Sequence, residues 1–271
     1  MTALIGIDWG TTSFRAWRMG AGGEVLDSVG DGPGILAAAG LPGGFRQAMQ
    51  DRIGSWLGTA PVIASGMITS RNGWIETSYL PLPLDAAALA ANLTLHEGIH
   101  FVTGAVSDPD GPAPDVMRGE ETEIIGHLAG GGGDGLFVLP GTHSKWAEVS
   151  AGEVVSFRSF LTAEILSALD AAPRDPFDKA AFTETVAQAM SRPASLAADL
   201  SSVRAGLALG RIEDAAAWSR MAGLMIGAEL AAARPWWLGQ NVVVIGESPL
   251  ADRYAEAMAE MLHERVRKEL W

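Results

Sequence analysis

The chain of 271 residues contains no cysteine, which excludes disulfide bonds and thiolate metal ligands. It also lacks positive charge: 19 Lys and Arg residues stand against 32 Asp and Glu residues, for a formal net charge of −13. Non-specific nucleic-acid binding needs a cationic surface, so no nucleic-acid partner is expected. No apolar run reaches the ~18 residues of a membrane span, and the chain opens almost at once into a predicted strand rather than a signal peptide. We expect a cytoplasmic protein without a membrane partner.

Common catalytic patterns are missing or occur in a misleading form. Neither a Walker A loop, G-x-x-x-x-G-K-[ST], nor a nucleophile elbow, G-x-S-x-G, is present. Residues 96–100, HEGIH, match the H-E-x-x-H zinc pattern. That pattern binds zinc only when both imidazoles share one face of a helix, and Gly98 followed by a strand-like segment argues against a helix. The sequence therefore predicts no zinc site.

What the sequence does contain is one short pattern written twice. Residues 5–13, IGIDWGTTS, and residues 136–144, LFVLPGTHS, each run from an apolar strand into a turn of glycine and hydroxyl residues. Strand-like alternation resumes after each turn, so each copy predicts a hairpin. Glycine permits close approach to the backbone, and N–H groups and hydroxyls donate to phosphate oxygens. The pair predicts two related lobes that hold one polyanionic ligand, such as a phosphate tail.

The rest of the chain predicts a mixed α/β order, repeated approximately after the glycine run at residues 130–133. We expect one domain over residues 1–128 and a second over residues 129–271. Predicted strands cover residues 4–19, 24–29, 61–64, 100–106, 154–160 and 242–245, and predicted helices cover residues 45–57, 86–93 and 120–128, most of 162–234, and 250 onward to 271.

Asp8 stands at the end of the first predicted strand, just before the glycine corner. A carboxylate in this position suits Mg²⁺, bound through water and shared with phosphates. An aspartate that caps a turn is the alternative for an isolated Asp-x-Gly, but the second copy of the hairpin favours the metal. Residues 141–145, GTHSK, offer N–H groups, hydroxyls and a cation; an ordinary turn is the alternative there, and the role of His143 stays open.

Two further segments carry polar residues that suit a substrate. Glu120 and Glu121 open a predicted helix beside Arg118, a candidate clamp for a carboxylate or phosphate. The two carboxylates either stabilise the helix start or supply a general base or metal ligand. Residues 65–74, SGMITSRNGW, form a polar loop with one aromatic residue, which suits a small polar ligand such as a sugar acid, although an exposed turn explains the same composition.

Together these motifs resemble the 2-dehydro-3-deoxygalactonokinase family of the actin/hexokinase/Hsp70 superfamily. The two hairpins resemble the superfamily's phosphate-1 and phosphate-2 motifs, and residues 242–254, VVVIGESPLADRY, resemble its adenosine motif. The segments that carry the resemblance lie in order over nearly the whole chain, at residues 7–13, 15–17, 64–67, 72–74, 116–122, 139–146, 157–164, 223–229, 246 and 253–254.

The resemblance implies an α/β fold of two ribonuclease H-like lobes, the actin-like ATPase fold, with a cleft between the lobes. It also implies an ATP-dependent kinase that phosphorylates the 6-hydroxyl of 2-dehydro-3-deoxy-D-galactonate in galactose and galactonate breakdown, with ATP and Mg²⁺ bound. The preference for this sugar acid over its gluconate epimer stays open.

The resemblance further implies a role for individual residues. Asp8 would organise Mg²⁺, and Glu120 or Glu121 would be the general base, with Asp115 as the fallback. The residues expected to hold the nucleotide and its phosphates are Gly10, Thr11, Thr12, Ser13, Gly141, Thr142, His143, Ser144, Gly246 and Ser248. Those expected to contact the sugar acid are Arg15, Met67, Asn72, Trp74, Arg118, Thr162 and Glu164.

Two other functions fit the same motifs. One is a phosphatase or nucleotidase of the superfamily, and the other is a catalytically weak protein that binds a nucleotide or sugar acid. The second draws on a departure at the C-terminus: the family has a further strand and helix there, whereas residues 260–271 are predicted to continue the last helix. Trp236 and Trp237, expected to be exposed, make a homodimer plausible.

Overall fold

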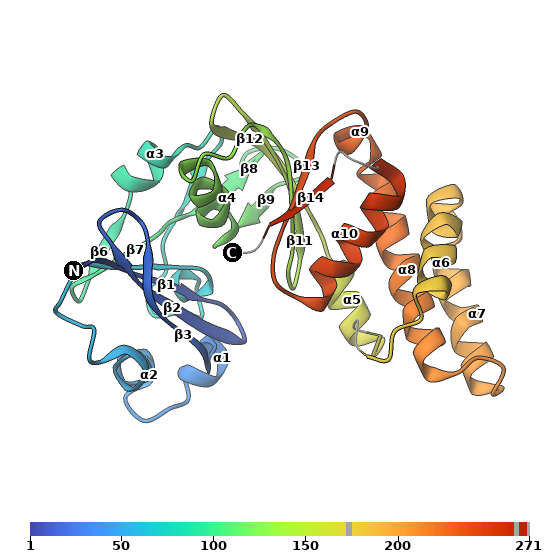
Figure 1. The fold of residues 1–271 in the computed structure, drawn as a ribbon, viewed down its shortest axis with the longest axis horizontal. Coiled ribbons are helices and arrows are strands. Elements are labelled where there is room, and N and C mark those ends of the chain that lie inside the picture. Colours follow the sequence, from blue (N-terminus) through green and yellow to red (C-terminus); the bar gives the residue numbers. More distant parts are fainter. Residues whose placement is uncertain (172–174, 263–265, 270–271) are drawn as a thin grey trace. The chain divides into compact units, whose positions relative to one another are not determined.

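The computed structural model describes residues 1–171, 175–262 and 266–269 (Figure 1). The chain divides into two compact units, Met1–Gly132 with Gly152–Val154, and Gly133–Ala151 with Val155–Trp271. Each unit contains a mixed sheet and its own hydrophobic core. In the described part of the chain, no helix combines the length and the apolar character that crossing a membrane requires.

The first unit is built on a six-stranded sheet in the order β3-β2-β1-β4-β7-β6. Strands β1 to β3 form an antiparallel meander, and β1, β4 and β7 run parallel to one another. Its members are β1 (Thr2–Trp9), β2 (Ser13–Gly20), β3 (Val25–Pro33), β4 (Val62–Ser65), β6 (Thr94–His96) and β7 (Ile99–Phe101). Alternate residues of β1, namely Ile5, Ile7 and Trp9, are buried in the core, as the two-residue period of a strand requires.

The remaining elements of the first unit are a three-stranded sheet and several helices. The small sheet has the order β5-β8-β9, with β5 (Tyr79–Pro81), β8 (Gly104–Ser107) and β9 (Asp115–Met117). The helices are α1 (Ile35–Ala38), α2 (Gly44–Ile53), the 3₁₀ turn Met67–Thr69, α3 (Ala86–Ala91) and α4 (Glu120–Ala129). The single strand predicted over residues 100–106 is in fact two, β7 and β8, in different sheets.

The second unit repeats the strand plan of the first. Its sheet has the order β12-β11-β10-β13-β14, in which β10 and β11 are antiparallel and β10, β13 and β14 run parallel. The strands are β10 (Gly135–Pro140), β11 (Ser144–Ser150), β12 (Glu153–Phe160), β13 (Val242–Ile245) and β14 (Val266–Glu269). This order matches β3-β2-β1-β4-β7, so the duplication predicted from the two hairpins is present in the folded chain.

Strand β14 overturns the prediction that the last helix continues through residues 260–271. Helix α10 is described over Pro249–Leu262, and Val266–Glu269 is a strand that pairs with β13 in parallel register. The sequence of β14, VRKE, is rich in helix-forming residues, but it closes the open backbone edge of β13. Tertiary pairing therefore overrides local propensity here. The rest of the predicted segment, at residues 263–265 and 270–271, lies outside the described residues.

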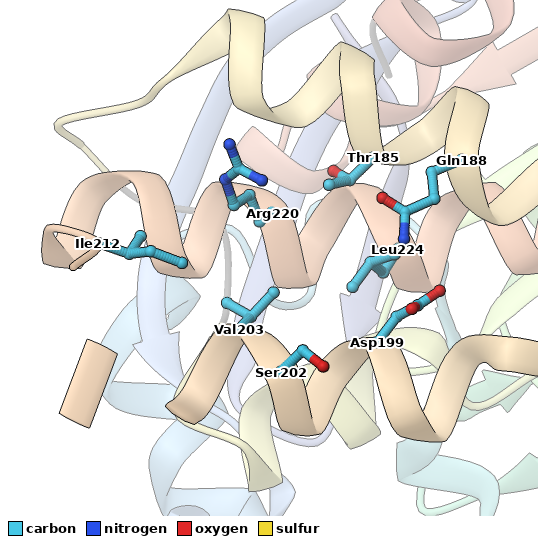
Figure 2. Close-up of a pocket in the computed structure, with 8 residues that line it drawn as sticks. All are labelled: Thr185, Gln188, Asp199, Ser202, Val203, Ile212, Arg220 and Leu224. Atoms are coloured by element: carbon cyan, nitrogen blue, oxygen red, sulfur yellow. The ribbon is translucent and has the colours of Figure 1, made fainter. Parts of the chain in front are cut away.

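The helices of the second unit pack beside its sheet (Figure 1), and the longest of those described, α8, is mostly buried. They are α5 (Thr162–Ala168), α6 (Lys179–Ser191), the 3₁₀ turn Pro193–Ser195, α7 (Leu196–Ala208), α8 (Asp214–Ala232), α9 (Arg234–Trp237) and α10. A cavity of about 160 Å³ lies between α6, α7 and α8 (Figure 2). The expectation of an exposed tryptophan pair is wrong: Trp236 is half-buried, and Trp237 is 5% exposed and donates its Nε1–H to Leu230 O.

Helices α6 and α8 approach so closely that two positions on α8 have no room for a side chain. A Cβ on Gly223 would lie 2.5 Å from Phe182 O, and a Cβ on Gly227 would lie 2.5 Å from Val186 O. Because backbone atoms cannot move aside as a flexible side chain can, these glycines set the distance between the two helices.

We expect Gly227→Ala to lower the free energy of unfolding by about 1–3 kcal/mol, because the new methyl group forces α6 and α8 apart. This loss should exceed the ~1 kcal/mol that alanine gains over glycine inside a helix. Urea denaturation measures the difference. Gly133→Ala is the control, since a Cβ there meets nothing within 4 Å; equal stability of the two variants would contradict the close packing.

Candidate active site

The first glycine corner, at residues 10–13, is held rigidly and leaves its hydroxyls free. Gly10 N donates to Ser13 O at 2.9 Å, and Ile35 N, at the start of α1, donates to Gly10 O at 3.0 Å. Thr12 and Ser13 are exposed and Thr11 is half-buried, and among the described residues their hydroxyls have no hydrogen-bond partner. The corner therefore offers unused donors on a fixed backbone, as a phosphate group requires.

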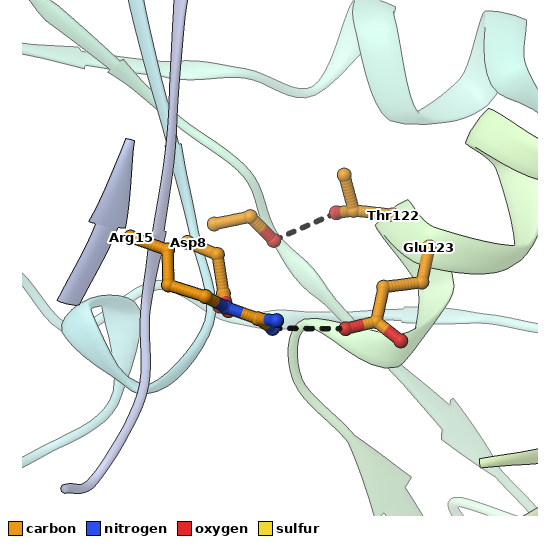
Figure 3. A network of polar contacts seen from close by, with 5 residues as sticks. Asp8, Arg15, Thr122 and Glu123 are labelled. Carbon is orange, nitrogen blue, oxygen red and sulfur yellow. Dashed lines mark hydrogen bonds and ion pairs between the residues drawn. The ribbon is translucent and has the colours of Figure 1, made fainter. Parts of the chain in front are cut away.

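Asp8 and Arg15 face each other across the same hairpin (Figure 3). Arg15 donates to Asp8 Oδ2 from Nη2 at 2.7 Å and from Nε at 3.1 Å. The Nη2 atom also lies 3.8 Å from Glu123 Oε1, on α4. One guanidinium thus stands between two carboxylates, one at the end of β1 and the other in the first turn of α4.

Two glycines let the start of α4 come this close to β1. Gly66, with φ 94°, has no room for a Cβ, which would lie 2.9 Å from Asp8 Oδ1. Gly119 has φ 116°, and a Cβ added to it would lie 3.2 Å from Gly66 Cα. Both need the left-handed conformation and the close approach that glycine alone allows. Beside them Ser65 Oγ and Thr122 Oγ1 share a hydrogen bond of 2.7 Å.

Glu120 and Glu121, the two carboxylates singled out from the sequence, both accept hydrogen bonds from backbone N–H groups at the start of α4. Glu121 is fully buried and accepts from Gly119 N, at 3.0 Å to Oε1 and 2.8 Å to Oε2, and from Thr122 Oγ1. Burial, followed by the neighbouring charge of Glu120, raises the pKa of Glu121 to about 7. Glu120 is half-buried and accepts from Arg118 N at 2.9 Å. Both side chains satisfy N–H groups at a helix start.

Glu123 is a candidate that the sequence reasoning missed. Burial, followed by the charges of Asp8 and Glu120, raises its pKa to about 8, although the Arg15 guanidinium acts in the opposite direction. Its side chain still keeps 32% of its surface exposed. The available signal was spacing: positions 120 and 123 of one helix face the same side. Asp115, the fallback base, lies in β9, where Oδ1 accepts from Val116 N.

Arg118 is engaged within the first unit. Its Nη1 donates to Thr69 O at 2.5 Å, Thr69 Oγ1 at 2.7 Å and Thr77 Oγ1 at 2.8 Å, and its Nη2 donates to Thr77 O at 3.2 Å. The guanidinium also stacks 4.3 Å from the ring centre of Tyr79. It anchors the polar loop rather than presenting a free cation.

The polar loop predicted to meet a sugar acid is partly core. Trp74 packs in an aromatic cluster, with ring centres 6.5 Å from Trp9, 6.3 Å from Phe45 and 5.9 Å from Phe101. Met67 is half-buried against the same core, whereas Asn72 is exposed. A tryptophan among polar residues is thus explained here by packing.

The second glycine corner, at residues 141–144, resembles the first in its exposed part. Gly141 and Thr142 are exposed, and His143 Nε2 lies 3.0 Å from Glu164 Oε2 in an exposed pair. The structure therefore brings together His143 and Glu164, two residues assigned to phosphate and to sugar acid respectively.

The buried side of this corner is organised by Glu229 of α8, which the sequence reasoning did not single out. Its carboxylate accepts from Ser144 Oγ at 2.9 Å, Trp146 Nε1 at 2.6 Å, Tyr254 Oη at 2.6 Å and the Thr162 hydroxyl. Burial raises the pKa of Glu229, and these hydrogen bonds oppose the shift. Ser144 and Thr162 hence direct their hydroxyls into the core. The signal for this cluster was a single acid within the apolar run at residues 221–232 of α8.

The segment after β13 shapes the predicted adenosine motif. Gly246 has φ 144°, which favours glycine, and its N–H donates to Glu269 O at 3.3 Å. Ser248 Oγ accepts from Ala251 N at 3.1 Å and so caps α10. In the described residues, no group of three or more His, Asp or Glu residues is arranged to hold a metal ion, and residues 96–100, the rejected zinc pattern, span two strands and the turn between them.

Comparisons with known proteins agree over most of the chain. A family model described as 2-keto-3-deoxy-galactonokinase matches residues 8–269. The curated "Probable 2-dehydro-3-deoxygalactonokinase DgoK1" of Rhizobium meliloti (strain 1021) is 35% identical over 244 residues, 84% of this chain and 79% of that protein. The 2-dehydro-3-deoxygalactonokinase of Escherichia coli (strain K12) is 32% identical over 274 residues, 96% of this chain and 91% of that protein.

A solved structure of a protein from Sinorhizobium meliloti, described under the same enzyme name, is similar with a TM-score of 0.87 and 32% identity. The match covers 98% of this chain and 93% of that chain. The fold is the actin-like ATPase fold, as the resemblance implied. The chain belongs to the 2-keto-3-deoxy-galactonokinase family.

Proposed function

We propose that this chain transfers the γ-phosphoryl group of ATP to the 6-hydroxyl of 2-dehydro-3-deoxy-D-galactonate in the cytoplasm. The observation that carries the proposal is the family match over residues 8–269. In the reaction a bond forms between the sugar oxygen and the γ-phosphorus, the bond to the bridging oxygen breaks, ADP leaves, and the hydroxyl proton passes to a base. Enzymes of this kind act by positioning and charge stabilisation.

The two glycine corners fit the phosphates of the nucleotide. An ideal Cβ on Gly10 or Gly141 would meet only atoms of its own corner, at 3.5 Å or more, so the outer side of each corner is open. We assign the phosphates to the backbone N–H groups and hydroxyls of Gly10 to Ser13 and of Gly141 to His143. Ser144 supports the second corner from beneath, and Gly246 and Ser248 are assigned to the adenosine.

Asp8 is assigned to Mg²⁺, which when bound would neutralise charge on the phosphates. A single carboxylate is enough, because Mg²⁺ usually takes one or two carboxylates and completes its shell with phosphates and water. Asp8 Oδ2 accepts from Arg15. Arg15 is therefore placed to exchange Asp8 for the carboxylate of the sugar acid when the metal binds.

For the general base we favour Glu120 or Glu123 over Glu121. The buried Glu121 spends both oxygens on the start of α4, whereas Glu123 is partly exposed beside Asp8 and Arg15. A base with a pKa near the working pH is the most effective proton acceptor. Asn72 and Glu164 are exposed, and Glu164 pairs with His143 of the second corner, so both remain candidates for sugar contact. Met67, Trp74, Arg118 and Thr162 would act through the loops and helices that they hold. A homodimer stays a prediction without an assigned surface.

We expect ADP release to depend on the added sugar acid, which a phosphatase or a mere binding protein would not show. A coupled ADP assay with 2-dehydro-3-deoxy-D-galactonate, and separately with its gluconate epimer, tests this. Replacing the true base, Glu120→Gln or Glu123→Gln, should lower kcat by about 10²- to 10⁴-fold. Glu76→Gln is the control, since Glu76 is exposed. Release of ADP or phosphate at the same rate without any sugar acid would reject the kinase assignment.

We expect kcat/KM to rise with pH and to level off above about pH 8, because a base with a pKa of about 8 must lose its proton to act. The Glu123→Gln variant should lose this rise along with its activity. A full pH profile of the wild type and of Glu120→Gln measures it. A profile flat between pH 6 and 8 in the wild type would remove Glu123 from the role.

We expect the stability of the protein to fall as pH rises through about 7. Glu121 binds its proton with a pKa of about 7 when folded and 4.5 when exposed, so its contribution is complete below pH 4.5 and is lost above 7. The shift corresponds to roughly 3 kcal/mol. Urea denaturation at pH 5 and pH 8 measures the difference, which Glu121→Gln should reduce and Glu76→Gln should not; an unchanged difference in Glu121→Gln would contradict it.

A further inference from the structure

The second glycine corner carries three successive backbone donors. The N–H groups of Gly141, Thr142 and His143 make no hydrogen bond to any described residue. These three residues bridge the end of β10 to the start of β11, where Pro140 and Ser144 lie opposite each other in the ladder. Successive N–H groups without a protein partner suit phosphate oxygens, so the affinity of the corner for phosphate depends on how firmly its ends are held.

One of these ends is held by Glu229, 85 positions further along the chain. Ser144 is fully buried, and its Oγ lies 2.9 Å from each carboxylate oxygen of Glu229. The same carboxylate accepts from the hydroxyl of Thr162. Thr162 stands two residues before Glu164, whose Oε2 lies 3.0 Å from His143 Nε2. Glu229 therefore restrains the corner at its end and, through the first turn of α5, at its side.

The first glycine corner provides a comparison within the same chain. Ser13 begins β2 as Ser144 begins β11, yet Ser13 is exposed and its hydroxyl has no partner in the described part of the structure. There the backbone itself ties the corner, since Gly10 N donates to Ser13 O and Ile35 N donates to Gly10 O. The described residues form no matching backbone hydrogen bonds at Gly141, so in the second unit the buried carboxylate supplies the restraint.

We propose that Glu229 is a positioning residue for nucleotide binding, which through Ser144 and Thr162 sets the three N–H groups of the second corner for the phosphates of ATP. The inference rests on the proposed kinase function, because it takes the corner as a phosphate site. Apolar residues of similar volume often stabilise a core at least as well as a buried charge does, so stability alone does not account for this carboxylate. A displacement of about 1 Å in a positioned group costs on the order of 100-fold in rate.

Ser144→Ala tests the link, because it separates the corner from Glu229 and leaves the carboxylate its donors from Trp146, Thr162 and Tyr254. Isothermal titration calorimetry of the whole chain with Mg²⁺ and AMP-PNP, a non-hydrolysable ATP analogue, gives the dissociation constant. We expect it to rise at least tenfold. A value within twofold of the wild type overturns the positioning role, whereas a wild type that does not bind AMP-PNP rejects the proposed function together with it.

Ser219→Ala is the matched control. Ser219 lies on α8, is also fully buried, and bonds through its hydroxyl to Ala215 O and Asp178 N, which are not part of the corner. Both substitutions thus delete one buried hydroxyl of the same unit. The Ser219→Ala variant should bind AMP-PNP within twofold of the wild type; a loss equal to that of Ser144→Ala would reduce the effect to general destabilisation and overturn the proposal.

Two substitutions of Glu229 test the carboxylate itself. Glu229→Gln keeps an oxygen for Ser144 and Trp146, and the hydroxyls of Thr162 and Tyr254 can accept from its amide, so AMP-PNP should bind within about fivefold of the wild type. Glu229→Met keeps the length without an acceptor and should weaken AMP-PNP as Ser144→Ala does; if it fails to fold, Ser144→Ala decides.

Steady-state kinetics separates the nucleotide from the sugar acid. In Ser144→Ala the KM for ATP should rise at least tenfold, while the KM for 2-dehydro-3-deoxy-D-galactonate stays within twofold. An equal rise in both KM values would indicate a structural role without selectivity for the phosphates and would overturn the proposal.

Discussion

The second unit depends on one buried carboxylate. Glu229 would be strongly destabilising if left alone in the core, because a charged or polar group without partners is costly there. Donors from β11, α5 and α10 satisfy it, through Ser144, Trp146, Thr162 and Tyr254. The same contacts fix the second glycine corner to three helices, α5, α8 and α10. The position of a phosphate-type corner is thus determined by a polar cluster on its hidden side.

The first unit reaches a similar corner by a different means. There the constraint is steric. A Cβ on Gly119 would lie only 3.2 Å from Gly66 Cα, and this close approach of the two backbones brings the start of α4 to Asp8. The two units therefore share the order and direction of their strands but not the contacts that hold their corners. The repeat thus preserves the arrangement of the strands, whereas the side chains that support each corner differ between the two units.

Backbone features were largely predictable from the sequence, whereas the direction of side chains was not. Glycine corners, the apolar strand at 242–245 and the amphipathic α2 follow from local chemistry. Ser144, Thr162 and Arg118 have residue types typical of ligand contact, yet tertiary partners far away in the chain use their polar atoms. Glu123 and Glu229 were missed for the same reason, since only folding brings Asp8 and Tyr254 beside them. Strand β14 depends on an edge that no local window contains.

The glycines of α8 have a mechanical consequence. At Gly223 and Gly227, which press on the backbone of α6, no side chain of α8 separates the two helices. The same helix carries Glu229, which accepts from Ser144 at the second glycine corner. Because α8 can approach α6 no further without a shift of backbone atoms, this packing also fixes the position from which Glu229 supports that corner.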